Sequence, residues 1–298
     1  RDVAPSRGLG DVYKRQINGL GMGSIYALIA IGYTMVYGIA RMINFAHGEF
    51  ITIGAFVSYG TAALIGANPI TMVICIIVSM LVCAIVSVIT EKLAYYPLRK
   101  RNTKKITALI TAIGVSYIIY SIFNIRFQEQ KGSPKFLNLT DFQLTIITII
   151  ITIVTVLLIT LFINKTKFGK AMRATSENPS AAKLMGINND AMISLTFAIG
   201  AALAGIGAVV YCLRIPYFKF SVGTEAIGLI PFVAAVVGGI GSLPGAVIGG
   251  FIIGIVQQLS MAFPVTSTWT PAIVYGLLIL ILMIKPTGIL GKMVGEKV

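Results

Sequence analysis

The sequence has few charged residues, because Lys, Arg, Asp and Glu make up 11% of its 298 residues, whereas soluble domains carry about 25%. It has one histidine and three cysteines, which argues against a histidine-rich metal site, a zinc site or a disulfide framework. No GxxxxGK[ST] string occurs, so the chain lacks the P-loop that would bind and hydrolyse ATP. No Ser-His-acid or Cys-His cluster is present either. We therefore expect no metal, no cofactor and no catalytic centre in this chain.

Apolar residues dominate instead, at 56% of the chain. A helix that crosses the hydrocarbon core needs about 20 mostly apolar residues. The sequence therefore predicts an all-α, polytopic transmembrane helical bundle with about eight spans, and leaves seven to ten open. The candidate spans are 17–39, 43–65, 70–94, 106–125, 143–163, 191–213, 226–262 and 268–284.

The seventh candidate span, 226–262, is too long for one crossing. It contains Gly238-Gly239, Gly241 and Pro244-Gly245, and this pattern predicts a broken or re-entrant helix, or two short crossings. We hypothesise that the glycine-interrupted regions near 42–49 and 238–250 are corresponding breaks in two structural halves.

The net charge of +14 does not indicate nucleic-acid binding, because the basic residues lie in short loops between apolar spans. Lysine and arginine in such loops mark the cytoplasmic side of a membrane protein. We therefore expect 97–105, 164–190 and the C-terminal tail in the cytoplasm, and 126–142 and 214–225 outside. Glu91, which is next to Lys92 near the end of a span, is interpreted as interfacial.

Residues 1–16 are expected to be foreign to the protein. The string from Asp11 to Gln16, DVYKRQ, resembles a translation of the transposon adaptor end used to prepare sequencing libraries. Such segments are excluded from fold reasoning, which leaves one transmembrane domain over 17–298. The alternative is the basic region of a signal sequence, but no small-residue cleavage site follows a short apolar core.

The stretch Met42–Glu49 contains the one histidine and one of the ten acidic residues, and it lies between two long apolar runs. Ionisable groups at membrane depth are costly and usually lie where a substrate, ion or proton passes. A helix that restarts near Asn44 would direct free N–H groups and its positive dipole end at a substrate carboxylate. Glu49 would then meet an ammonium group, and His47 would form a hydrogen bond. The candidate pathway residues are Asn44, Phe45, His47, Gly48 and Glu49.

A structural interpretation of the same stretch stays open. In it, Asn44 caps the helix, and His47 and Glu49 satisfy neighbouring helices. An ion-coupled carrier usually places several acids inside its spans, but here Glu49 is the main candidate. This scarcity favours a pore that is moved by partner subunits.

The string GLGMGSIYALIAIGYTMVYGIARMINFAHGEFITIGAF resembles the permease subunits of ABC importers for branched-chain amino acids, and more distantly those for urea and short amides. The resemblance runs from about Ile17 to the C-terminus, and NFAHGE carries most of its specificity. It implies a multi-pass subunit in the lipid of the bacterial plasma (inner) membrane that works by alternating access. It also implies a second related permease, two ATP-binding subunits and an extracytoplasmic substrate-binding protein as partners. The alternatives are a urea or amide permease, and a self-contained carrier or channel.

The segment 164–190 contains the signals of a short helix. Asn178 can cap it, Pro179 suits its first position, and Gly186 can end it. Two turns of helix are not stable alone in water, so we expect a partner to pack on it. The segment resembles the coupling loop of ABC importer permeases, whose short helix docks on the ATPase. The alternative is an ordinary basic loop beside the membrane. The coupling residues expected from this resemblance are Glu177, Asn178, Pro179, Ala181, Leu184, Met185 and Gly186, with Ala181, Leu184 and Met185 on one face.

Overall fold

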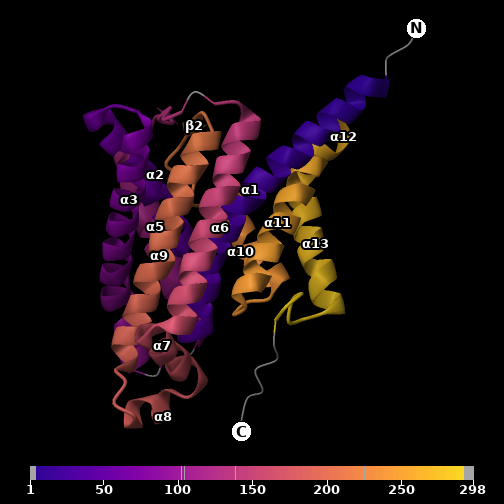
Figure 1. The fold of residues 1–298 in the computed structure, drawn as a ribbon. Helices are drawn as coiled ribbons and strands as arrows, with labels where there is room; N and C mark the ends of the chain where they lie inside the picture. The colour runs from indigo at the N-terminus through magenta and orange to yellow at the C-terminus, as the bar shows by residue number, and fades with distance from the viewer. Residues whose placement is uncertain (1–4, 102, 104, 138, 225, 292–298) are drawn as a thin grey trace.

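Long apolar helices make up nearly all of the computed structural model, which describes residues 5–101, 103, 105–137, 139–224 and 226–291 (Figure 1). The first half of the chain contains α1 (Pro5–Ala40), α2 (His47–Ile65), α3 (Pro69–Thr90), the π-helical turn η1 (Glu91–Tyr95), α4 (Tyr96–Lys100), α5 (Lys105–Arg126) and β1 (Lys131–Gly132). The second half contains α6 (Asp141–Lys165), α7 (Lys167–Glu177), α8 (Pro179–Leu184), α9 (Asn189–Arg214), β2 (Tyr217–Phe218), α10 (Ala226–Gly238), α11 (Leu243–Ser260), α12 (Pro264–Ser267) and α13 (Thr270–Ile284). Over the described ranges the one sheet is the antiparallel pair β1–β2.

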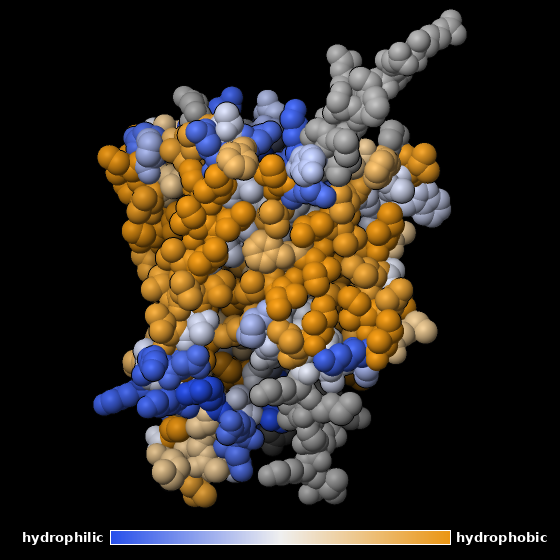
Figure 2. Space-filling view, turned by 45° about the vertical axis from the view of Figure 1, so that its right-hand side comes forward, coloured by the Kyte–Doolittle hydropathy of each residue, from blue (hydrophilic) through white to orange (hydrophobic). Residues whose placement is uncertain are grey.

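Seven helices in the described part of the chain are long and apolar enough to cross a membrane, and α10 and α13 are shorter apolar helices. Figure 2 shows the corresponding apolar belt between two polar ends. The predicted all-α polytopic bundle is therefore confirmed, and its span count lies within the expected range. Residues 1–4 lie outside the described part, and residues 5–16 continue α1, so the proposed foreign origin of 1–16 stays a prediction.

Helix α1 is the centre of the bundle and packs against α6, α9, α10 and α11. The outer helices bury small polar residues and expose large apolar ones, as membrane helices do. In α3, for example, the Ser79 hydroxyl donates to Gly54 O over 3.1 Å and the Ser87 hydroxyl donates to Phe197 O over 3.0 Å. The inward stripe recurs at every fourth position: Thr71, Cys75, Ser79, Cys83 and Ser87. All three cysteines are buried free thiols, in agreement with their position in apolar runs.

The predicted break in the seventh span is confirmed, because α10 and α11 are separated by residues 239–242. Gly239 and Gly241 have φ angles of 108° and 95°, which favour glycine. A second break separates α1 from α2, but α2 begins at His47 rather than near Asn44. The two breaks lie side by side, because Ile43 and Ile240 line the same small cavity.

A third break was not predicted. Residues 219–224 run from β2 at one end of the bundle into its interior, where Gly223 contacts Gly48 and α10 then begins. Ser221, Val222 and Gly223 are buried. The expectation that 214–225 is an outer segment therefore does not hold for 221–223, which are buried in the bundle.

The loops that the lysine and arginine pattern assigns to the same side of the membrane lie at the same end of the bundle. The side chain of Arg99, which follows η1, contacts Asp190 at the start of α9, so the loops around 97–101 and 164–190 lie at one end. At the opposite end, Lys131 pairs with Phe218 in the sheet. In Figure 1 these two ends are at the bottom, with α7 and α8, and at the top, with β2.

Candidate functional site

The Glu49 carboxylate is fully buried at the start of α2 and accepts hydrogen bonds from three hydroxyl groups. Thr224 donates over 2.7 Å, and Ser116 of α5 and Thr52 of α2 donate over 3.2 Å each. Among the described residues, no basic side chain forms an ion pair with Glu49. The positive end of the α2 dipole adds to its stabilisation, because Glu49 is in the first turn of that helix. The site is thus a buried acceptor surrounded by neutral donors.

Close contacts between glycines bring the loop that contains Thr224 next to Glu49. A Cβ atom on Gly48 would overlap the carbonyl oxygen of Gly223 and lie 3.1 Å from the Cα of Gly228. This contact places the loop before α10 against the first turn of α2. Gly223 N donates over 2.9 Å to the Thr52 hydroxyl, which leaves the Thr52 proton directed at Glu49. The N-terminal ends of α2 and α10 therefore meet inside the bundle, beside one carboxylate.

His47 lies in a different environment from Glu49. Its Nε2 would be 2.6 Å from a Cβ atom on Gly32, and its ring centroid is 4.4 Å from that of Tyr33. A Cβ on Gly32 would also lie 2.8 Å from Gly200 O, so α1 and α9 cross closely beside the imidazole. Residues two apart on a helix do not face each other. His47 and Glu49 therefore lie in different surroundings, and their predicted contacts with a substrate stay a prediction.

Asn44 forms a turn rather than a helix cap. Its Oδ1 accepts hydrogen bonds from Ala46 N over 3.0 Å and from the Tyr95 hydroxyl over 2.7 Å. The residue at the N-cap position of α2 is Ala46, whose side chain forms no capping hydrogen bond, so the helix begins later than expected. Asn44 Nδ2 has no hydrogen-bond partner among the described residues.

Asn44 also lines the small cavity between the two breaks, which has room for about one water molecule. Phe45 packs beside it, with its ring centroid 5.3 Å from that of Phe232 in α10. The remaining lining residues are Tyr33, Tyr37, Ile43, Phe232, Ala235 and Ile240. An amino acid does not fit into this cavity.

The short helix in 164–190 has the geometry that its sequence predicts. Asn178 Oδ1 accepts a hydrogen bond from Ala181 N over 3.0 Å, and Pro179 opens α8. Gly186 follows with φ of 80°. Ile187 N bonds to Ala182 O and Gly186 N to Lys183 O, which is the pair of bonds that ends a helix at a left-handed glycine.

The apolar face of α8 is unusually exposed. Leu184 is 89% and Met185 83% accessible, and Ala181 is also exposed, whereas Ala182 is buried against the bundle. A preceding helix, α7, was not predicted; Glu177 is its last residue. Two features of the sequence indicate α7. The hydroxyl of Thr166 caps the helix by accepting a hydrogen bond from Gly169 N, and the apolar side chain of Met172 is fully buried. The segment is therefore two helices, of which the second presents large apolar side chains to its surroundings.

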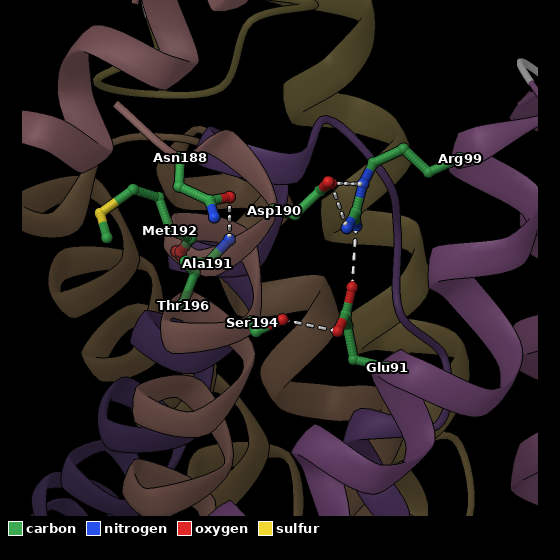
Figure 3. A network of polar contacts seen from close by, with 8 residues as sticks. All are labelled: Glu91, Arg99, Asn188, Asp190, Ala191, Met192, Ser194 and Thr196. Carbon is green, nitrogen blue, oxygen red and sulfur yellow. Dashed lines mark hydrogen bonds and ion pairs between the residues drawn. The ribbon is translucent and has the colours of Figure 1, made fainter. Parts of the chain in front are cut away.

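Glu91, which was interpreted as interfacial, is enclosed by the protein rather than exposed at its surface. Glu91 is fully buried, and its carboxylate lies 2.9 Å from the Arg99 guanidinium and accepts a 2.7 Å hydrogen bond from Ser194 (Figure 3). Arg99 also contacts Asp190 at 2.9 Å. A sequence signal existed, because Glu91 and Tyr95 continue the four-residue stripe of α3 through the π turn.

Comparisons with known proteins agree with the sequence resemblance. The family described as "Branched-chain amino acid transport system / permease component" matches residues 16–283. The high-affinity branched-chain amino acid transport system permease protein LivH of Escherichia coli (strain K12) is 40% identical over 96% of this chain and 97% of its own length. BraD of Pseudomonas aeruginosa, a permease of the same description, is 39% identical over 95% of this chain and 96% of its own. A probable LivH permease of Methanocaldococcus jannaschii is 32% identical over 90% of this chain and 89% of its own.

Proposed function

The chain belongs to the family of branched-chain amino acid transport permeases, and on this premise we propose that it is the membrane subunit through which leucine, isoleucine and valine enter in an ABC importer. The observation that carries this function is the 40% identity to LivH along almost the whole of both chains. The chain is a multi-pass permease and not an enzyme. ATP hydrolysis belongs to partner ATPase subunits, and an extracytoplasmic binding protein delivers the substrate.

The complete importer has a finer organisation that we also propose. Two ATP-binding subunits and a second, related permease complete the complex in the bacterial inner membrane. The cytoplasmic side is the end of the bundle that contains α7 and α8. The exposed face of Leu184 and Met185 supports this proposal, because two turns of helix need a partner surface to stay folded.

The Glu49 site is proposed as part of the translocation pathway. A leucine in transit carries an ammonium group and a carboxylate. Glu49 is a buried carboxylate without a cation among the described residues, so the ammonium group supplies the missing charge. The N-terminal ends of α2 and α10 suit the substrate carboxylate, because free N–H groups and the dipole end stabilise anions.

The competing role for Glu49 is structural. In it, the hydroxyl bonds from Ser116 and Thr224 only tie α5 and the loop before α10 to α2. We favour the pathway because the three donors are neutral hydroxyl groups, so that no basic side chain among the described residues competes with a substrate cation for Glu49.

The membrane domain is proposed to span residues 17–298, with residues 1–16 foreign to it. The side chains of 13–16 are exposed, so they add little packing to α1. A version in which Met precedes Ile17 is expected to insert and transport like the full chain. Loss of insertion in that version alone contradicts the proposal.

The function is tested in cells that lack their own branched-chain amino acid importers. The chain is expressed with its partner subunits and binding protein, and uptake of labelled leucine is measured with unlabelled competitors. Isoleucine and valine are expected to compete, and urea and acetamide are not. Competition by urea or acetamide alone contradicts the proposed substrate class and favours an amide permease.

A further inference from the structure

The break before α2 is held by a buried hydrogen bond to another element. The Tyr95 hydroxyl donates over 2.7 Å to Asn44 Oδ1, and both residues are buried. The same oxygen accepts from Ala46 N, directly before the first residue of α2. A displacement of Tyr95 therefore acts on the turn that starts α2 and on the cavity beside it.

Tyr95 is the last residue of the π turn η1, and Glu91 is its first. Glu91 is fixed by Arg99 and Ser194, and Arg99 is fixed in turn by Asp190 (Figure 3). Asp190 is in the first turn of α9, at the end of the segment 164–190. The Arg99 guanidinium donates two hydrogen bonds to Asp190 and forms an ion pair with the buried Glu91 carboxylate, and such charge-assisted contacts are stronger than neutral ones. The start of α9 and the π turn are therefore held as one unit.

A second connection joins the same two regions. Arg41 follows α1 directly, and its Nη2 donates over 2.8 Å to Ser176 O in the last turn of α7. Arg41 has φ of 52°, the one positive φ among the described non-glycine residues. That backbone conformation is unfavourable for a residue with a Cβ, so the surrounding contacts hold the break in place.

From these two connections we infer that Tyr95 and Arg41 are positioning residues that transmit movement of the segment 164–190 to the break at 41–46. Tyr95 acts through Asn44, and Arg41 acts through the backbone of the break itself. The π turn is the element expected to change, because π turns are rare within helices and frequent at functional sites. The inference rests on the proposed function, since it takes 164–190 as the ATPase-facing segment.

Both routes end at the same six residues, and neither includes Leu184, Met185 or Glu49. This separates the inference from the roles proposed for α8 and Glu49. A purely structural role for Tyr95 predicts less assembled complex. A positioning role predicts a normal amount of complex that couples ATP hydrolysis to transport less well.

The test uses the complete importer in proteoliposomes, and it compares Tyr95→Phe with Tyr96→Phe. Both variants lose one hydroxyl group and keep the ring, but only Tyr95 bonds to Asn44. The measured quantity is leucine transported per ATP hydrolysed. We expect this ratio to fall about two- to tenfold in Tyr95→Phe, the range for one buried hydrogen bond, and to stay at the parent value in Tyr96→Phe.

A second readout follows the break itself. A single cysteine replaces Ile43, which lines the cavity beside Asn44, in a background without the three native cysteines. ATP is expected to change its rate of labelling by a small thiol reagent in the parent and in Tyr96→Phe. In Tyr95→Phe this ATP-dependent change is expected to be lost while the ATPases stay bound.

An unchanged transport ratio and an unchanged labelling response in Tyr95→Phe overturn the inference. If Tyr95→Phe assembles poorly, Arg41→Gln gives the second test, because Arg41 is exposed and its loss removes only the bond to Ser176. A normal ratio in Arg41→Gln then overturns the inference as well. If the unsubstituted importer takes up leucine without ATP, the proposed function is refuted. The inference then fails as well, because it rests on that function.

Discussion

Gly48 in the first turn of α2 and Gly223 in the loop before α10 touch so closely that a Cβ atom on either one would overlap the carbonyl oxygen of the other. The two residues are 175 positions apart in sequence, and their contact joins two helix starts inside the bundle. It also brings Thr224 to Glu49. The proposed pathway site therefore depends on two residues without side chains.

Gly48→Ala is expected to destabilise the permease by about 1–3 kcal/mol, because an added methyl group at a close backbone contact forces the helices apart. The thermal unfolding midpoint of the purified protein in detergent measures the effect. Gly60→Ala is the matched control in the same helix, since nothing lies within 4 Å of a Cβ built there. Equal midpoints for the two variants contradict the close contact.

Glu49→Gln is expected to reduce leucine uptake about 10- to 100-fold, the range for losing one hydrogen bond to a charged group. The substitution keeps the size of the side chain and an acceptor for Thr224. Glu129→Gln, at a side chain that is 88% exposed, is the control and is expected to transport normally. Normal uptake by Glu49→Gln excludes a charge requirement in the pathway, and loss of assembly assigns Glu49 a structural role.

The exposed face of α8 gives a prediction about ATPase binding. Leu184→Asp combined with Met185→Asp is expected to abolish ATPase retention, because each large side chain covered by a partner contributes about 1.5–3 kcal/mol. Co-purification of ATPase subunits with the tagged permease measures retention. Gln128→Asp with Gln130→Asp adds the same charge at exposed positions at the opposite end and is expected to retain the ATPases. Full retention by the α8 variant refutes the docking proposal.

Sidedness is tested with single cysteines in a cysteine-free background. Lys100→Cys and Ser180→Cys lie at exposed positions at one end, and Glu129→Cys lies at the other. An impermeant thiol reagent added to intact cells is expected to label only the Glu129 position, because basic loops stay in the cytoplasm. Labelling at positions 100 and 180 but not at 129 reverses the assignment.

Local signals in the sequence predicted local structure well. Asn178, Pro179 and Gly186 each specify one backbone conformation or one capping bond, and all three have the expected role. The glycine-rich interruption at 238–241 likewise ends α10. Such features depend on a few adjacent residues, so they can be recognised without knowledge of the fold.

Contacts between distant segments were not predicted. Glu91 is next to Lys92 near the end of a span, which suggested an interfacial residue, but its side chain is buried against Arg99 on the far side of a π turn. The re-entry of 219–224 depends on Gly223 meeting Gly48, and a glycine does not indicate which segment it will contact. For the same reason, the sequence grouped His47 with Glu49, whereas α1 and α9 enclose His47.

The central claim is that ATP hydrolysis on partner subunits moves branched-chain amino acids through this chain. The most direct measurement is uptake of labelled leucine into proteoliposomes that contain the purified complete importer, with ATP and the binding protein supplied on the appropriate sides and no ion gradient. The account predicts uptake that requires ATP, requires the binding protein and is lost in the Leu184→Asp, Met185→Asp variant. Leucine uptake by the permease alone, driven by an ion gradient and indifferent to ATP, would contradict it.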